Sequence, residues 1–238
     1  MSGSYRLHRR VRGLELPPEY LERLELLRKG LVKWFRESGR KFLWRGEVGW
    51  YGVLLAEFLL VRTRSEVAER AFYELLARFP APEALCSAGV APVREVFERI
   101  GLPSRAERLV ATVCKVLEDY GGKLPCDYRE LLKLPGVGDY IARVVLSRVC
   151  GRHVAFVDSN VLRVLSRFLG AGLSATKAAE LLERSIPGGE LLDVNVALLD
   201  LGALVCKPRK TLCPLCPLSP GCSTSLRTRR AQGSAGNP

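Results

Sequence analysis

The chain has 238 residues, a formal net charge of +12 at pH 7, 47% hydrophobic residues and 26% charged residues. This balance excludes a largely disordered chain and predicts one large or two modest globular domains. No apolar run reaches the roughly 18 residues of a membrane-spanning helix, and no signal core follows the basic N-terminus, so we expect a cytoplasmic, nucleoid-associated protein with no membrane partner. The excess of Lys and Arg favours nucleic acid as the partner, although a basic chain that merely stays soluble is the alternative.

Apolar residues recur at helical spacing along almost the whole chain, which predicts an all-α fold. In chain order, the predicted helices cover residues 21–35, 51–60, 67–79, 93–100, 106–120, 139–149, 161–169, 175–184 and 194–204. Pro80 and Pro82 punctuate the pattern, and so do the glycines at 121–122. Only residues 154–157 could form a strand, and this run is too short and isolated to build a sheet.

One predicted helix is apolar on every face except for Glu57, the single charged residue in the run 50–61. Such a helix is buried, so the carboxylate must be paired, protonated or turned toward a cleft. Burial would raise its pKa, and Glu57 could then transfer a proton near neutral pH. An ion pair with Arg45 or Arg62 is the alternative.

A Gly-rich turn of sequence LPGVG, residues 134–138, separates two predicted helices. Asp127 and Glu130 have the spacing of a capping box, so a short helix ends in the turn and a longer one leaves it. This is the pattern of a helix-hairpin-helix, in which glycines allow close backbone approach and helix amides can bind a phosphate. An ordinary Gly-rich connection is the alternative. The predicted contacts to a nucleic-acid backbone are Gly136, Val137 and Gly138.

Asp158 follows the apolar residues 154–157 and precedes the helix predicted from residue 161. A carboxylate at this position can cap the helix, whose dipole favours the charged form. Glu57 and Asp158 could therefore divide acid and base roles between them. Helix capping alone is the alternative.

Four cysteines near the C-terminus follow the pattern C-x6-C-x2-C-x5-C within 17 residues. Thiolates this close in sequence can reach one metal centre. Zinc sites more often combine two C-x2-C pairs, whereas only one is present, so the spacing favours an iron–sulfur cluster over zinc, with disulfides third. The predicted ligands are Cys206, Cys213, Cys216 and Cys222.

Three Asn, one Gln and one Met in the whole chain are typical of a thermophilic protein. Such an origin would permit disulfides among the four remaining cysteines, although reduced thiols are the default for an intracellular chain. These cysteines are Cys86, Cys114, Cys126 and Cys150.

Hairpin, aspartate and cysteine pattern occur in an order that resembles the helix-hairpin-helix DNA glycosylases of the endonuclease III and MutY superfamily, over roughly residues 22–222. Residues 134–138 are similar to the family hairpin, and VDSNV at 157–161 is similar to its catalytic motif. Asp158 also lies 18 positions after Tyr140, as the two corresponding positions do in the family. The resemblance implies a 4Fe-4S cluster on the four clustered cysteines.

The same resemblance implies two helical lobes, a six-helix barrel and a cluster lobe, with the active site in the cleft between them. The implied parts are an N-terminal segment 1–45 that packs with the cluster lobe, a barrel 46–151 with the helix-hairpin-helix at 127–150, a cluster lobe 152–222 with its cluster loop at 206–222, and a flexible basic tail 223–238.

Bifunctional members of the superfamily place a lysine where this chain has Tyr140, and a phenol cannot form their imine intermediate. Residues 55–63, 100–107 and 120–122 look most like archaeal Mig-type glycosylases, which remove thymine or uracil opposite guanine. The resemblance thus implies a monomeric, monofunctional enzyme acting on double-stranded DNA with a mismatched or deaminated base. An adenine glycosylase lacking the C-terminal domain of MutY, and a non-catalytic cluster-containing DNA-binding module, are the alternatives.

The resemblance also implies roles for individual residues. Asp158 would stabilise the positively charged sugar or activate water, and Asn160 would orient water or a phosphate. Tyr140 would contact the sugar or its 3′ phosphate, while Glu57 would hydrogen-bond or protonate the base. The wedges that fill the gap left by the extruded nucleotide would be Arg62 and Leu102, although Arg62 could equally contact a phosphate or pair with Glu57.

Overall fold

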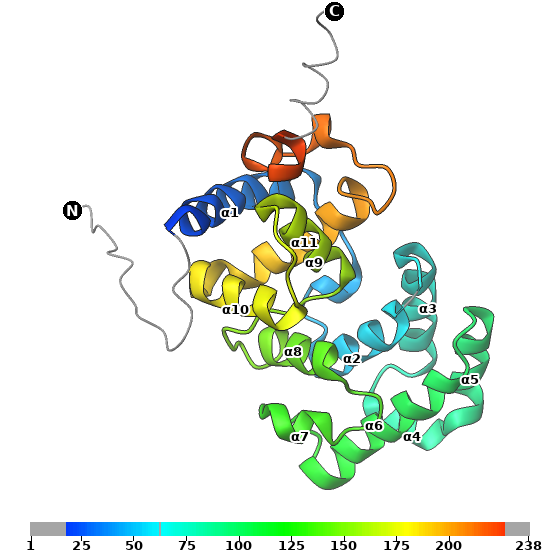
Figure 1. Ribbon diagram of the computed structural model, residues 1–238. Helices are drawn as coiled ribbons and strands as arrows, with labels where there is room; N and C mark the ends of the chain where they lie inside the picture. The colour runs from blue at the N-terminus through cyan, green and yellow to red at the C-terminus, as the bar shows by residue number, and fades with distance from the viewer. Residues whose placement is uncertain (1–17, 62, 227–238) are drawn as a thin grey trace, which may run out of the picture.

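The computed structural model describes residues 18–61 and 63–226. Within these ranges the chain is helical, with no β-strand and a single isolated bridge between Cys206 and Thr211, so the prediction of an all-α fold is confirmed (Figure 1). None of the helices in this part of the chain is both long and apolar enough to cross a membrane. The α-helices are α1 (Pro18–Ser38), α2 (Gly49–Leu60), α3 (Ser65–Arg78), α4 (Pro82–Ala88), α5 (Val90–Arg99), α6 (Ser104–Tyr120), α7 (Tyr128–Leu132), α8 (Asp139–Arg148), α9 (Ser159–Leu169), α10 (Ala175–Ser185) and α11 (Leu191–Leu204). Short 3-10 helices cover η1 (Leu43–Arg45), η2 (Gly188–Glu190), η3 (Cys213–Leu215) and η4 (Ser219–Gly221).

The described helices enclose two large hydrophobic cores and a small third cluster of Val53, Val144 and Phe156. The first lies among α2 to α8 and includes the buried rings of Phe58, Phe72 and Phe97. The second lies among α1, α9, α10 and α11, with Leu165 and Leu198 fully buried in it. Figure 1 shows α1 beside α11, although most of the chain separates them in sequence. The first helix of the fold therefore packs against the last ones.

Pro82 follows α3, as expected, and is the first residue of α4, because proline is tolerated at the first position of a helix. Residues 154–157 form no strand, in line with the expectation that this run is too short and isolated to build a sheet. Instead, the buried amide of Asn195 on α11 accepts a hydrogen bond from the Phe156 N–H (3.1 Å) and donates one to the Phe156 carbonyl (2.6 Å). A side chain thus supplies the hydrogen bonds that a neighbouring strand would give.

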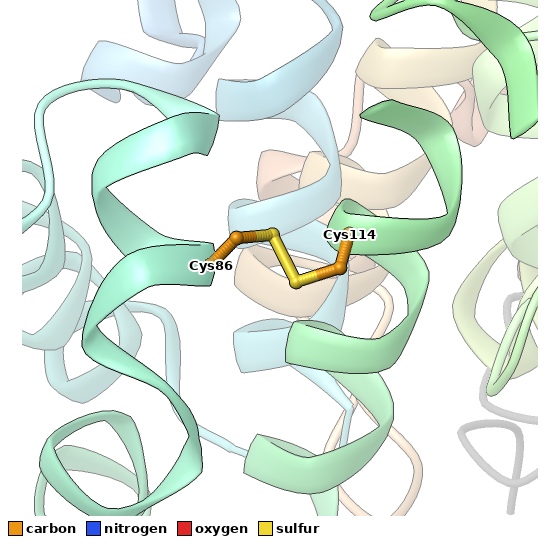
Figure 2. Close-up of a disulfide and its surroundings, with 2 residues drawn as sticks. All are labelled: Cys86 and Cys114. Carbon is orange, nitrogen blue, oxygen red and sulfur yellow. A yellow bond between two sulfur atoms is a disulfide. The ribbon is translucent and has the colours of Figure 1, made fainter. Parts of the chain in front are cut away.

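Two disulfides link elements around the first core. Cys86 of α4 is bonded to Cys114 of α6, 28 positions away (Figure 2). Cys126, before α7, is bonded to Cys150, just after α8, 24 positions away. All four thiols are therefore paired rather than reduced, and the second disulfide ties together the two ends of the segment that contains α7, the Gly-rich turn and α8.

The helix-hairpin-helix forms as predicted, with one difference at its start. The Asp127 carboxylate caps α7 by accepting hydrogen bonds from the N–H groups of Arg129 (2.8 Å) and Glu130 (3.1 Å). The Glu130 side chain does not return the bond. It accepts hydrogen bonds from Lys133 and Tyr120 instead, so only half of the predicted capping box is made.

The turn between α7 and α8 requires glycine at position 136. The backbone there has φ +80°, and a Cβ would lie 2.9 Å from the Phe58 ring and 3.0 Å from Cβ of Arg108. Val137 buries its side chain in the first core, and its N–H donates to the Leu134 carbonyl at 3.1 Å. The first amides of α8, from Asp139 onward, follow this turn and have no acceptor within their helix.

Candidate active site

A cavity of about 590 Å³ lies between the two cores. Its walls come from the chain before α2, from α2 and α8, and from the start of α9 and part of α11. All four predicted catalytic side chains line this one cavity, although they span a hundred positions of sequence. They are Glu57, Tyr140, Asp158 and Asn160.

Asp158 caps α9 and lines the cavity at the same time. One carboxylate oxygen accepts from the N–H groups of Asn160 and Val161, each at 2.8 Å, and the other accepts from the Asn160 side-chain amide at 2.9 Å. These donors and the N-terminus of α9 stabilise a carboxylate anion. Asp158 can therefore cap α9 and belong to the site at the same time, although the sequence analysis treated these two roles as alternatives.

The Asn160 side chain is hydrogen-bonded within the protein, and its role in orienting water or a phosphate stays a prediction. Its amide nitrogen donates to Asp158, and its oxygen accepts from the Arg163 guanidinium at 2.7 Å. Arg163 in turn donates to the carbonyls of Cys206 and Gly202, each at 2.8 Å. Asn160 therefore holds the Asp158 carboxylate in place, and Arg163 connects this pair to Gly202 of α11 and to Cys206, which follows that helix.

Glu57 is buried, with 6% of its surface exposed. Burial raises the pKa of its carboxyl to about 7; Arg148 opposes the rise and Asp158 adds to it. The ion pair considered with Arg45 does not form, because Arg45 pairs with Asp200. Arg62, the other partner considered, lies outside the described residues. Glu57 can therefore carry a proton near neutral pH, as predicted from its apolar surroundings.

Tyr140 presents a neutral phenol to the cavity. Burial raises the pKa of Tyr140 well above its usual value, and the carboxyl groups of Glu57 and Asp158 raise it further. Its ring meets the Phe156 ring edge to face, with centroids 6.1 Å apart. Among the described residues, no lysine lines the cavity, and Lys133 points elsewhere, to Glu130 at 2.7 Å.

Two charged residues of the site were missed in the sequence analysis. Arg148 lies two helical turns after Tyr140, with Val144 between them, and all three line the cavity; this i, i+4, i+8 spacing was a signal for a shared face. Asp200 is completely buried and is the single charged residue in the run 194–204. The reasoning that identified Glu57 would have identified Asp200 too.

Leu102, one of the two predicted wedge residues, does not line the cavity. Leu102 lies between α5 and α6, partly buried against the first core, with its N–H bonded to the Phe97 carbonyl at 2.8 Å. Arg62 lies outside the described residues. Both wedge roles stay predictions.

The four C-terminal cysteines line a second, small cavity with their thiols free. Within the described residues, no three His, Cys, Asp or Glu side chains are grouped closely enough to hold a single metal ion. A zinc ion needs four thiolates in a tight tetrahedron, whereas a cluster of several irons separates its thiolates around a larger body. Four soft thiol ligands around one cavity suit either iron or zinc.

An all-helical protein whose hairpin and helix-capping carboxylate flank one cavity has the architecture of a base-excision enzyme. Residues 55–187 match the HhH-GPD family, described as the HhH-GPD superfamily of base excision DNA repair proteins. The chain belongs to this family, and its enzyme class is DNA glycosylase.

Its similarity to individual relatives extends over most of both chains. A thymine-DNA glycosylase of Aeropyrum pernix is 37% identical over 210 residues, covering 84% of this chain and 94% of the relative. A thymine/uracil-DNA glycosylase of Methanothermobacter thermautotrophicus is 32% identical over 199 residues, covering 81% and 90%. The solved structure of a thermostable thymine-DNA glycosylase superposes with a TM-score of 0.79 at 30% identity, covering 87% of this chain and 98% of that one.

Proposed function

We propose that this glycosylase hydrolyses the N-glycosidic bond of thymine or uracil mispaired with guanine and leaves the abasic strand uncut. The observation that carries the proposal is the grouping of Asp158, Tyr140 and Glu57 around one cavity that has no lysine among its described lining residues. An imine intermediate needs an amine, and a phenol cannot supply one. The names of the similar glycosylases support the choice of base.

The target nucleotide leaves the stack before its base can enter the cavity, and a mispaired nucleotide costs least to extrude. The cavity volume of about 590 Å³ is within the range of small-ligand sites and accommodates a nucleobase. The turn with Gly136 and Gly138, together with the first amides of α8, binds the DNA backbone without reading sequence.

Loss of the base leaves positive charge on the deoxyribose ring. Asp158, held by the Asn160 side chain and two backbone amides, stabilises this charge or activates the attacking water. Tyr140 donates a hydrogen bond to the sugar or its phosphate. Protonated Glu57 donates a hydrogen bond to the base edge, which suits a pyrimidine better than complete proton transfer because thymine leaves as an anion.

The test measures base release from duplexes containing T·G, U·G, adenine opposite oxidised guanine, or matched pairs, with and without alkali. We expect T·G and U·G strands to break only after alkali. Asp158→Asn should slow release at least about 100-fold while duplex binding survives, and Asp119→Asn on the exposed face of α6 is the matched control.

Three results would favour other functions. A nick that borohydride traps would contradict hydrolysis without strand cleavage. A preference for adenine opposite oxidised guanine would establish the adenine glycosylase. Salt-sensitive binding with no base released in a single turnover would establish a DNA-binding module.

We also propose that Cys206, Cys213, Cys216 and Cys222 hold a 4Fe-4S cluster. Their free thiols around one cavity support it. The cluster would stabilise the segment after α11, which has few buried side chains of its own. Hydrolysis of the glycosidic bond needs no electron from it.

Finally, we propose a monomer in the cytoplasm of a thermophile. Two disulfides and the scarcity of Asn, Gln and Met support the thermophilic origin. Size-exclusion chromatography with light scattering tests the monomer.

A further inference from the structure

A buried carboxylate forms ion pairs with two arginines that line the cavity. Asp200 of α11 is fully buried. Its carboxylate oxygens accept hydrogen bonds from the side chain (2.7 Å) and the backbone N–H (2.8 Å) of Arg40. They also accept hydrogen bonds from both terminal nitrogens of Arg45, at 2.7 and 2.8 Å. Arg40 and Arg45 themselves line the cavity with Glu57 and Asp158. The two arginines therefore belong to the site, while Asp200 lies behind them.

Aromatic stacking fixes the orientation of both guanidinium groups. Each lies over the Phe42 ring, 5.1 Å from its centroid, and that ring stacks on Trp44 at 4.5 Å. Arg40 also donates to Ser65 at the start of α3, at 2.6 Å. A guanidinium held at its edge by a carboxylate and at its face by a ring has little freedom to move.

Each arginine keeps N–H groups for a ligand. Arg40 donates through Nε to Asp200 and through Nη1 to Ser65, while Arg45 donates through Nη1 and Nη2 to Asp200 and through Nη1 also to the Arg40 carbonyl. In the part of the chain that the structure describes, Arg40 Nη2 and Arg45 Nε have no hydrogen-bond partner. These groups are rigid, charged N–H donors on a cavity wall.

The positively charged side chains that line the cavity favour the release of a base that leaves as an anion. Arg40, Arg45 and Arg148 line the cavity with the carboxyl groups of Glu57 and Asp158, and burial raises the pKa of Glu57 to about 7. Thymine and uracil depart as anions whose negative charge is delocalised onto their two carbonyl oxygens. Adenine, in contrast, departs most readily after it has gained a proton. Fixed cations therefore lower the activation barrier for release of a pyrimidine anion and raise the barrier for release of a protonated adenine.

We propose that Asp200 is a positioning residue that fixes Arg40 and Arg45 as hydrogen-bond donors to the oxygens of the departing pyrimidine. This arrangement stabilises the leaving anion and disfavours adenine. The inference rests on the proposed function, because it concerns the base that the cavity would hold.

The experiment compares single-turnover release of thymine, uracil and 5-fluorouracil opposite guanine at saturating enzyme. Fluorine stabilises the anion, so 5-fluorouracil needs the least help in leaving. We expect Arg40→Gln and Arg45→Gln each to slow thymine release by about 100-fold and 5-fluorouracil release by clearly less. Asp200→Asn should show the same dependence on the leaving group. Arg94→Gln, which removes an exposed α5 arginine paired with Glu98 and Glu107, should change none of the rates.

Each Gln variant leaves Asp200 paired with the other arginine, so the pair of variants decides the question even if Asp200→Asn does not fold. Equal losses for all three bases, or no loss, would overturn the inference and leave the proposed function standing. If the unaltered protein released none of the three bases, the proposed function would fall and the inference with it.

Discussion

The protonation of Glu57 should appear in the pH dependence of base release. Its pKa of about 7 in the cavity means that the hydrogen-bonding form disappears as the pH rises through that value. We expect the rate of the unaltered protein to fall above pH 7, and Glu57→Gln, which is neutral at every pH, to lose this decline. Single-turnover rates between pH 5 and 9 provide the measurement, with Glu98→Gln as the exposed control.

The same group links pH to stability. The pKa of Glu57 is 4.5 in an unfolded chain and about 7 in the fold, so the folded state holds the proton more tightly. The contribution to stability is present below pH 4.5 and is lost as the pH rises to about 7. Glu57→Gln should not show this loss when urea unfolding is compared at pH 5 and pH 7.5. An identical pH trend in both proteins would contradict a buried, protonated Glu57.

The close contact between α11 and α9 makes Gly202 important for the position of the Asp158 carboxylate. A Cβ at Gly202 would lie 2.6 Å from Cβ of Asn160, the residue that holds Asp158. Gly202→Ala should therefore cost about 1–3 kcal/mol of unfolding free energy and slow base release more than it weakens DNA binding. Gly172→Ala is the control, since no atom lies within 4 Å of its added Cβ. Unchanged rates in the first variant would show that α9 tolerates the displacement.

At the residue scale, sequence identified the groups that break a pattern. Glu57 breaks an apolar run and Asp158 stands at a helix start, and both lie in the cavity. Sequence could not show that Arg40 and Arg45 share Asp200, because contacts across about 160 positions depend on how helices pack. The sequence also could not show that the Asn160 side chain forms hydrogen bonds with both Asp158 and Arg163.

At the element scale, the disulfide between Cys126 and Cys150 should affect DNA binding as well as stability. It encloses the helix-hairpin-helix, whereas the bond between Cys86 and Cys114 joins α4 to α6 outside it. Loops of 24 and 28 positions predict a loss of about 3.5 kcal/mol for removing either bond. Cys126→Ser with Cys150→Ser should also weaken duplex binding, because the loosened hairpin must be ordered again on binding.

Urea unfolding and fluorescence anisotropy with a mismatched duplex provide the two readouts. The double variant at Cys86 and Cys114 is the matched control and should lose stability with little change in affinity. Equal changes in affinity for the two double variants would rule out a special role for the hairpin disulfide.

The helices themselves were predictable because an amphipathic or buried helix reveals its period over ten residues or more. The exception was α4, with 7 residues, which is too short to show a period. Disulfide pairing was not predictable either, because it depends on distances between helices that a sequence does not contain.

At the scale of the whole molecule, the proposed cluster should hold the C-terminal segment against the second core. Cys213→Ser should lower the iron content and the visible absorbance of the purified protein and reduce its thermal stability. Leu215→Ala is the matched control, because Leu215 lies in the same 3-10 helix with 71% of its surface exposed and is not a ligand. Full iron content in Cys213→Ser would remove this cysteine from the ligand set.

The order of motifs predicted the all-α architecture and the family, but the cavity itself arises only from packing. Its walls combine the first core and the second, and residues 154–157 connect the two sides. The division of the chain into lobes at residues 46, 152 and 223 stays a prediction from the resemblance.

The packing of α1 against α11 has a consequence for biosynthesis. A ribosome releases α1 before α11, so the surface on which α1 docks exists only after α11 has left the exit tunnel. Asp158 is also made before α11, although residues of α11 form part of the cavity wall. A nascent chain that still lacks α11 therefore lacks part of the wall that groups Glu57, Tyr140 and Asp158.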